Sequence, residues 1–314
     1  MDFRHANPTV LKLGHYAKAV SRNIAIRDFL AELYDRLDVP APAKLSSIDL
    51  DENPEQMAQA IRYELGIDEF QISADSKKDF FREFRKLIER LGIFVVQDQY
   101  ISDSIDGLAL FHANFTSNYI LLNPSKRNSG RKSFTLAHEL AHILGKRSAL
   151  SDDYNSNNDV ELYCNVFASS LLLPRNAVQE FSELQNLRFN SYSTALSSSI
   201  MIADYFNVSI SAALVRVHQI GISDKNYYYE FAKSFGEDNH LDSMKQKQRG
   251  GPAEGPDQGV IAIAYLGQRA AALISSALER NVTSPMELCQ RIGLSKKRTL
   301  RLAKIAKTEG YTFE

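Results

Sequence analysis

Two histidines and a glutamate within five residues form the pattern with the clearest chemical use in this sequence. The segment reads His138-Glu139-Leu140-Ala141-His142. On a helix, positions i and i+4 project from the same face, so both imidazoles can bind one metal ion. Glu139 leaves the helix beside this pair, where its carboxylate can act as a base on a water bound to the metal. The spacing predicts a zinc site that hydrolyses peptide bonds.

A catalytic zinc ion usually has three protein ligands and one water, so a third ligand is expected near the histidines. We expect Glu161 to provide it, because it begins the next helix, nineteen residues after His142, and a short connection can fold that helix back. Asp152, Asp153 and Asp159 are alternatives. They lie in a loop-like segment, where the geometry of a metal site is harder to hold.

Three further polar side chains are candidates for supporting roles. Asn165 lies one turn after Glu161, and its amide oxygen can accept the outer N–H of a ligand histidine and fix its tautomer. His112 ends a strand-like run and is a candidate to stabilise an oxyanion; a polar residue that only closes a strand is the alternative interpretation. Tyr163 is a second candidate for that role, and packing on an amphipathic helix is its alternative.

The composition restricts the class of protein and its environment. In 314 residues, 37 basic and 38 acidic side chains nearly cancel, so any affinity for nucleic acid or membranes must be local. The chain has no signal-like start and no run near the roughly 18 apolar residues of a membrane span, which predicts a cytoplasmic protein without membrane contact. Cys164 and Cys289 are far apart, so neither a disulfide framework nor a thiolate zinc site is indicated.

The periodicity of apolar residues predicts an α+β fold that is mainly helical, with a small antiparallel sheet. Residues 1–53 are expected to form a helical arm, with one amphipathic helix over Ser21 to Leu37. Residues 54–235 are expected to form the main domain, which carries the histidine pattern. The expected strands of this domain are Ile93 to Val96, Gly107 to Phe111 and Tyr119 to Leu122.

The second half of the chain contains a helix-turn-helix-like segment and a linker. The segment 190–222 has the helix-turn-helix pattern, but the few charges between Ala203 and Ile222 favour packing on the main domain over DNA binding. Residues 236–258 lack periodicity and are rich in Gly, Pro, Gln and charge, which predicts a flexible linker. Residues 259–314 are expected to form a C-terminal helical segment, attached through that linker.

Basic residues gather near the C-terminal end without an intervening acidic residue. They are Arg291, Lys296, Lys297, Arg298, Arg301, Lys304 and Lys307. Lys297, Arg301 and Lys304 share one face of an expected helix that follows a turn at Gly293-Leu294-Ser295. This face is a candidate for contact with DNA or with an acidic partner, and a merely solvated surface is the alternative.

Two stretches of sequence resemble a known family. The run FTLAHELAHILG at 134–145, followed by ELYCNVFASSLLLP at 161–174, resembles the signatures of the ImmA/IrrE-type metallopeptidases. The similarity covers about residues 54 to 175 and is looser over 1–53 and 190–222. Ala141 stands where many members have Gly, and Cys164 where Ala is usual; both are small side chains. The further segments that resemble the family are Ala58 to Gly66, Leu91 to Val95 and Ile120 to Asn123.

The resemblance implies a zincin-like domain and a function. By it, His138, His142 and Glu161 would be the zinc ligands and Glu139 the catalytic acid and base. Family members typically cut a helix-turn-helix transcriptional repressor at one site, so such a repressor is the expected protein partner. The rival interpretations are a DNA-binding regulator and an antitoxin-like interaction protein on the same scaffold. An intact Glu139 argues against the second, because a structural metal site has no use for a base.

Overall fold

The computed structural model describes residues 14–39, 47–98, 105–112, 118–125, 128–146, 157–235 and 257–313. The helices are α1 (Gly14–Leu37), α2 (Pro54–Leu65), α3 (Ile67–Gln71), α4 (Lys77–Arg90), α5 (Ser129–Leu144), α6 (Asn157–Leu172), α7 (Arg175–Leu184), α8 (Tyr192–Tyr205), α9 (Ile210–Gln219), α10 (Tyr228–Phe235), α12 (Gln258–Leu266), α13 (Gln268–Glu279), α14 (Pro285–Ile292) and α15 (Lys296–Thr308). The strands are β1 (Phe94–Gln97), β2 (Gly107–Leu110) and β3 (Tyr119–Leu122).

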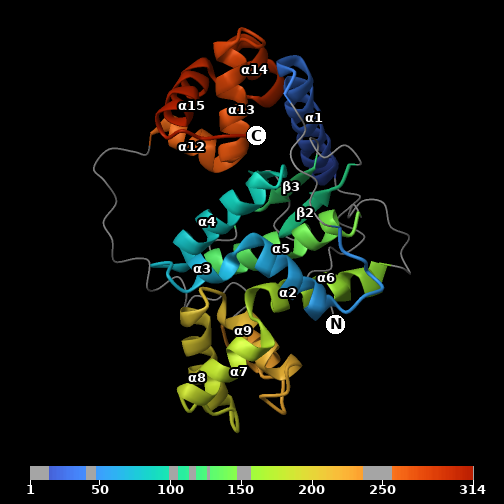
Figure 1. Cartoon of the computed structure of the whole chain (residues 1–314), viewed down its shortest axis with the longest axis vertical. Coiled ribbons are helices and arrows are strands. Elements are labelled where there is room, and N and C mark those ends of the chain that lie inside the picture. Colours follow the sequence, from blue (N-terminus) through green and yellow to red (C-terminus); the bar gives the residue numbers. More distant parts are fainter. Residues whose placement is uncertain are drawn as a thin grey trace.

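These elements form three tiers. Figure 1 shows the sheet with α2 to α6 in the middle, α7 to α9 at one end, and α12 to α15 beside α1 at the other. The predicted mainly helical α+β fold is confirmed. Among the described residues no single helix has the length and hydropathy of a membrane span, although the bent pairs α8 with α9 and α12 with α13 pass that test together.

The sheet is mixed rather than antiparallel throughout. Its order is β1-β3-β2, with β2 antiparallel to β3 and β1 parallel to β3. The prediction of an antiparallel sheet is therefore right for β2 with β3 and wrong for β1 with β3. The physical reason lies in the strand order: β2 forms the far edge and runs opposite to β3, so β3 lies at the centre with the same direction as β1.

Alternate residues of the strands enter two separate cores, as the two-residue period of a strand requires. Val95 and Ile120 pack in the core formed with α4, α5 and α6. Phe94 and Leu121 pack in a second core with α1 and the C-terminal helices. Both faces of this small sheet are therefore covered. The histidine-bearing α5 lies on the face that carries Val95 and Ile120.

A buried ion pair connects the C-terminal helices to the middle tier. Glu89 accepts hydrogen bonds from the backbone N–H groups of Gln268 (2.8 Å) and Arg269 (3.2 Å) at the start of α13. Arg85 donates to Glu89 (3.0 Å) and to the carbonyl oxygen of Ala264 at the end of α12 (2.8 Å). The sequence did not predict this packing of the C-terminal segment. Most of its expected linker, residues 236–256, lies outside the described residues.

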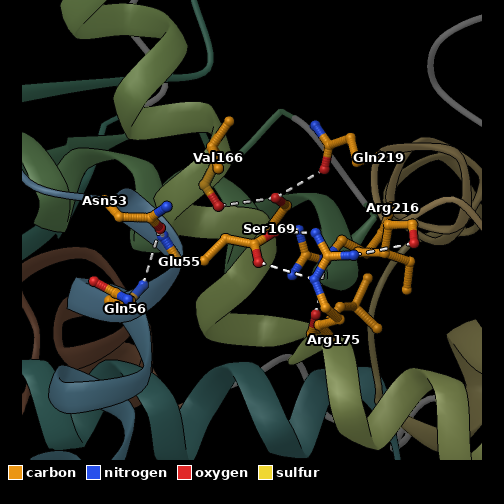
Figure 2. Close-up of polar contacts among 10 residues, drawn as sticks. Asn53, Glu55, Gln56, Val166, Ser169, Arg175, Arg216 and Gln219 are labelled. Carbon is orange, nitrogen blue, oxygen red and sulfur yellow. Dashed lines mark hydrogen bonds and ion pairs between the residues drawn. The ribbon is translucent and has the colours of Figure 1, made fainter.

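The helix-turn-helix-like segment packs on the main domain. Arg216 of α9 is buried, donating to the carbonyl oxygen of Leu173 (2.9 Å) and to the carboxylate of Glu55 on α2 (2.9 Å). Figure 2 shows that Arg175, at the start of α7, also pairs with the carboxylate of Glu55. A Cβ added at Gly130 of α5 would lie only 2.5 Å from the backbone at the start of α9. These contacts bury the second helix of the segment.

Candidate metal centre

The two helices α5 and α6 bring three metal-binding side chains together. His138 and His142 come from α5 and Glu161 from α6, and their ligand atoms all lie within 4.8 Å of one another. Glu161 oxygens are 3.1 Å from His138 Nε2 and 3.2 Å from His142 Nε2. Two atoms at zinc–ligand distance and the tetrahedral angle lie about 3.3 Å apart. The donor set and its spacing therefore fit a zinc ion.

The three side chains differ in exposure. His138 and His142 are buried against the first core, whereas the Glu161 side chain is 17% exposed. α6 begins at Asn157, so Glu161 lies one turn inside the helix rather than at its start. The regular helix fixes its carboxylate, and the cluster reaches the surface on the α6 side.

The two histidines keep the Glu161 carboxyl ionised. Burial alone would raise the pKa of Glu161, but hydrogen bonds from His138 and His142 outweigh it and hold that pKa well below its ordinary value. A carboxylate must be deprotonated to bind a metal ion. Glu161 is therefore in its metal-binding form throughout the neutral range.

Asn165 and Cys164 lie next to the histidines. The amide oxygen of Asn165 is 3.1 Å from His138 Nδ1. A proton on Nδ1 donates to this oxygen and leaves the Nε2 lone pair for the metal. Burial raises the pKa of the Cys164 thiol, which keeps it protonated beside His142. A neutral thiol is not a metal ligand, so the described cluster consists of two imidazoles and one carboxylate.

The other predicted site residues are not among the three clustered metal-binding side chains. Tyr163 directs its hydroxyl to the carbonyl oxygen of Asp49 (3.1 Å), away from the cluster, and burial raises its pKa to about 12. His112 is exposed beyond the end of β2, and its backbone N–H donates to the side chain of Asn118. Asp159 is exposed on α6. Asp152 and Asp153 lie outside the described residues.

A glycine that sequence reasoning missed lies against Glu139. A Cβ added at Gly107, the first residue of β2, would be 2.6 Å from Thr135 Cγ2 and 2.9 Å from Glu139 Oε1. The preceding residue, Asp106, accepts a hydrogen bond from Arg131 of α5 (2.7 Å), which holds the strand on the helix. The signal available in the sequence was the pair of small residues Gly107 and Ala109 on one face of a strand.

The comparisons with known proteins concern the part of the chain that contains this centre. Residues 88–218 match the model of the IrrE N-terminal-like domain, a peptidase family. The chain is also 35% identical over 105 residues to the radiation response metalloprotease IrrE of Deinococcus radiodurans. These 105 residues are 31% of this chain and 30% of that relative. The chain thus matches less than a third of the relative's length. Because the histidine–glutamate cluster lies inside the matched residues, this part of the chain is similar to the ImmA/IrrE family of HExxH metallopeptidases.

Proposed function

We propose that this chain is a zinc-dependent endopeptidase that cuts a protein partner in the cytoplasm. The observation that carries the proposal is a cluster of three donors with a further carboxylate, Glu139, on the same helix. Structural zinc sites have four protein ligands, whereas catalytic ones have three. A three-donor set beside a base is the arrangement that hydrolysis requires.

The residues around the cluster have separate roles in hydrolysis. A bound zinc ion supplies a Lewis acid and lowers the pKa of its water to about 7. Glu139 accepts the proton from the attacking water and then transfers it to the leaving amine. Asn165 positions the imidazole of His138. Gly107 leaves room for Glu139 in the position from which it acts.

The sheet edge next to Glu139 supports a mode of substrate binding. In the described part of the chain, β2 pairs with β3 on one side only, so its other edge can accept an extended peptide. Because β2 begins at Gly107, against Glu139, a peptide paired with this strand lies next to the base. Backbone pairing of this kind holds the scissile bond without depending on its side chains.

The proposed substrate is a helix-turn-helix transcriptional repressor. Support for it comes from the family, whose members this chain resembles, and from the similar protein of Deinococcus radiodurans, which is a radiation response metalloprotease. A cytoplasmic enzyme that acts on one regulator must discriminate strongly against other proteins. Contact with DNA through the C-terminal basic helix would bring such an enzyme to its repressor.

A cleavage assay tests the proposed substrate. The zinc-loaded full chain is incubated with a repressor encoded beside its gene and, separately, with casein; products are followed by gel electrophoresis and mass spectrometry. We expect one main cut in the repressor and little cutting of casein. Rapid cutting of casein at many positions, with no preference for the repressor, would contradict the proposed substrate but not the peptidase activity.

A methyl group at position 107 is expected to impair catalysis without removing the metal. In Gly107→Ala the new Cβ meets Thr135 Cγ2 and displaces Glu139, and a misplacement of about 1 Å can cost about 100-fold in rate. We expect kcat to fall by about 10- to 100-fold with unchanged zinc content. Adding Thr135→Ser, which removes Cγ2, should restore part of the activity. Thr135→Ser alone is the matched control, and equal rates in Gly107→Ala and the unchanged protein would refute this role of Gly107.

A further inference from the structure

Helix α15 presents a basic face to solvent and buries the opposite side. Thr299, Leu302 and Ala306 are buried against α12, α13 and α14. The outward side carries three exposed lysines with an exposed leucine between them. At 3.6 residues per turn these four side chains fall within about 100° of the helix circumference. We call them the α15 basic face: Lys296, Lys297, Leu300 and Lys304.

The connection from α14 to α15 has the form of a helix-turn-helix. α14 is followed by Gly293, whose φ of 73° is a left-handed conformation that favours glycine. Leu294 is buried, and the hydroxyl of Ser295 accepts the hydrogen bond that begins α15. A three-residue turn containing glycine is typical of this motif. α13 packs on α15 from behind and completes a three-helix unit, which Figure 1 shows at the end of the molecule away from α7 to α9.

Acidic residues neutralise the surroundings of this face but not the face itself. Arg291 pairs with Glu32 of α1, and Lys307 pairs with Glu279 of α13 at 3.0 Å. Arg301 pairs with Asp257. Across the described residues, Lys296, Lys297 and Lys304 have no ion-pair partner. Three adjacent positive charges therefore remain for a ligand of opposite charge.

We propose that α14 and α15 bind double-stranded DNA, with α15 in the major groove. In a helix-turn-helix the second helix enters the groove by its N-terminal part, which here carries Lys296 and Lys297. Lysines that contact phosphates release condensed counterions and supply affinity. Leu300, 51% exposed in the middle of the face, can contact a thymine methyl group.

The chain contains an internal comparison for this assignment. α8 and α9 are also two helices joined by a short turn, but α9 is buried by its contacts with Leu173, Glu55 and Gly130. A helix buried in this way cannot enter a DNA groove. α14 and α15 are joined in the same way as α8 and α9, but the outer face of α15 is exposed and basic. α15 also lies outside residues 88–218, the part of the chain that matches the peptidase family.

Fluorescence anisotropy of the full chain with a labelled 30-base-pair duplex tests the proposal. We expect salt-dependent binding that Lys296→Ala/Lys297→Ala/Lys304→Ala weakens at least about 10-fold near 0.1 M salt. The slope of log affinity against log salt should become shallower by about 2.7, because each phosphate contact contributes about 0.9. The matched control is Lys18→Ala/Lys78→Ala/Lys233→Ala, which removes three exposed lysines from α1, α4 and α10. Thermal melting of both variants establishes that they are folded.

Two competitors separate DNA from other acidic ligands. Methyl green, which occupies the major groove, should displace the protein from the duplex, whereas a minor-groove ligand should not. Glu139→Gln should bind the duplex as the unchanged protein does. Three results would overturn the proposal: no salt-dependent binding of the duplex, equal affinity in the two triple variants, or tighter binding of polyglutamate than of DNA through the same lysines.

Discussion

Replacement of Glu139 by glutamine is expected to reduce peptide hydrolysis by about 100- to 10,000-fold, the usual contribution of a positioned acid or base. Glutamine keeps the length and shape of the side chain, so its contact with Gly107 is retained. The amide cannot accept a proton from the attacking water. Zinc content should stay near one ion per chain, because Glu139 is not among the three clustered donors.

The measurement is cleavage of the repressor by zinc-loaded protein, with metal analysis of the same preparation. Glu180→Gln is the matched control, since Glu180 is exposed on α7 and the substitution removes the same charge far from the cluster. We expect this control to retain full activity. Activity of Glu139→Gln near that of the control would remove Glu139 from the mechanism.

Short-range patterns made part of this molecule predictable. The relation between His138 and His142 depends only on helix geometry, and the amphipathic pattern of α5 indicated that helix. The boundaries of α2 were likewise local, because Asn53 caps its first turn and Gly66 ends it in a left-handed conformation. Such signals lie within a few residues of the feature that they determine, so one sequence is enough to find them.

Contacts between distant segments were not predictable in the same way. The parallel pairing of β1 with β3 depends on where the intervening chain passes, which the alternation of residues does not record. The hydrogen bond from the Gln268 N–H to Glu89 joins residues 179 positions apart. Gly107 faces Glu139 only because β2 lies on α5. Each of these contacts forms only in the folded protein, so the local sequence does not predict it.

The C-terminal helices show how such contacts change an interpretation. Their apolar side chains share a core with Phe94, Tyr119 and Leu121 of the sheet. Deleting residues 257–313 would expose that core, so loss of activity in the truncated protein would not identify a binding site. Substitutions on the outer face of α15 leave the core intact and are the better test.

Replacement of Glu161 by alanine is expected to lower zinc affinity by more than the 10- to 100-fold that loss of a residue supporting a ligand costs. Glu161 is one of three donors, and its oxygens lie 3.1 and 3.2 Å from the two imidazole nitrogens. Removing it leaves two protein ligands, fewer than a catalytic zinc site uses. Asn165→Leu provides a graded comparison, because it removes only the hydrogen bond to His138 Nδ1. The zinc affinity of Asn165→Leu should fall by no more than about 10- to 100-fold.

Zinc affinity of the three proteins is measured by competition with a chromophoric chelator, and circular dichroism checks their fold. Affinity should fall in every case as pH decreases, because protons compete with the metal for the imidazoles. In the unchanged protein this decrease should reflect His138 and His142, since the Glu161 carboxyl remains ionised well below neutral pH. The expected order of affinity is the unchanged protein, then Asn165→Leu, then Glu161→Ala. Undiminished zinc binding in Glu161→Ala would place the third ligand elsewhere. Weaker zinc binding in Asn165→Leu than in Glu161→Ala would contradict the assignment of Glu161 as a ligand and of Asn165 as a residue that only positions His138.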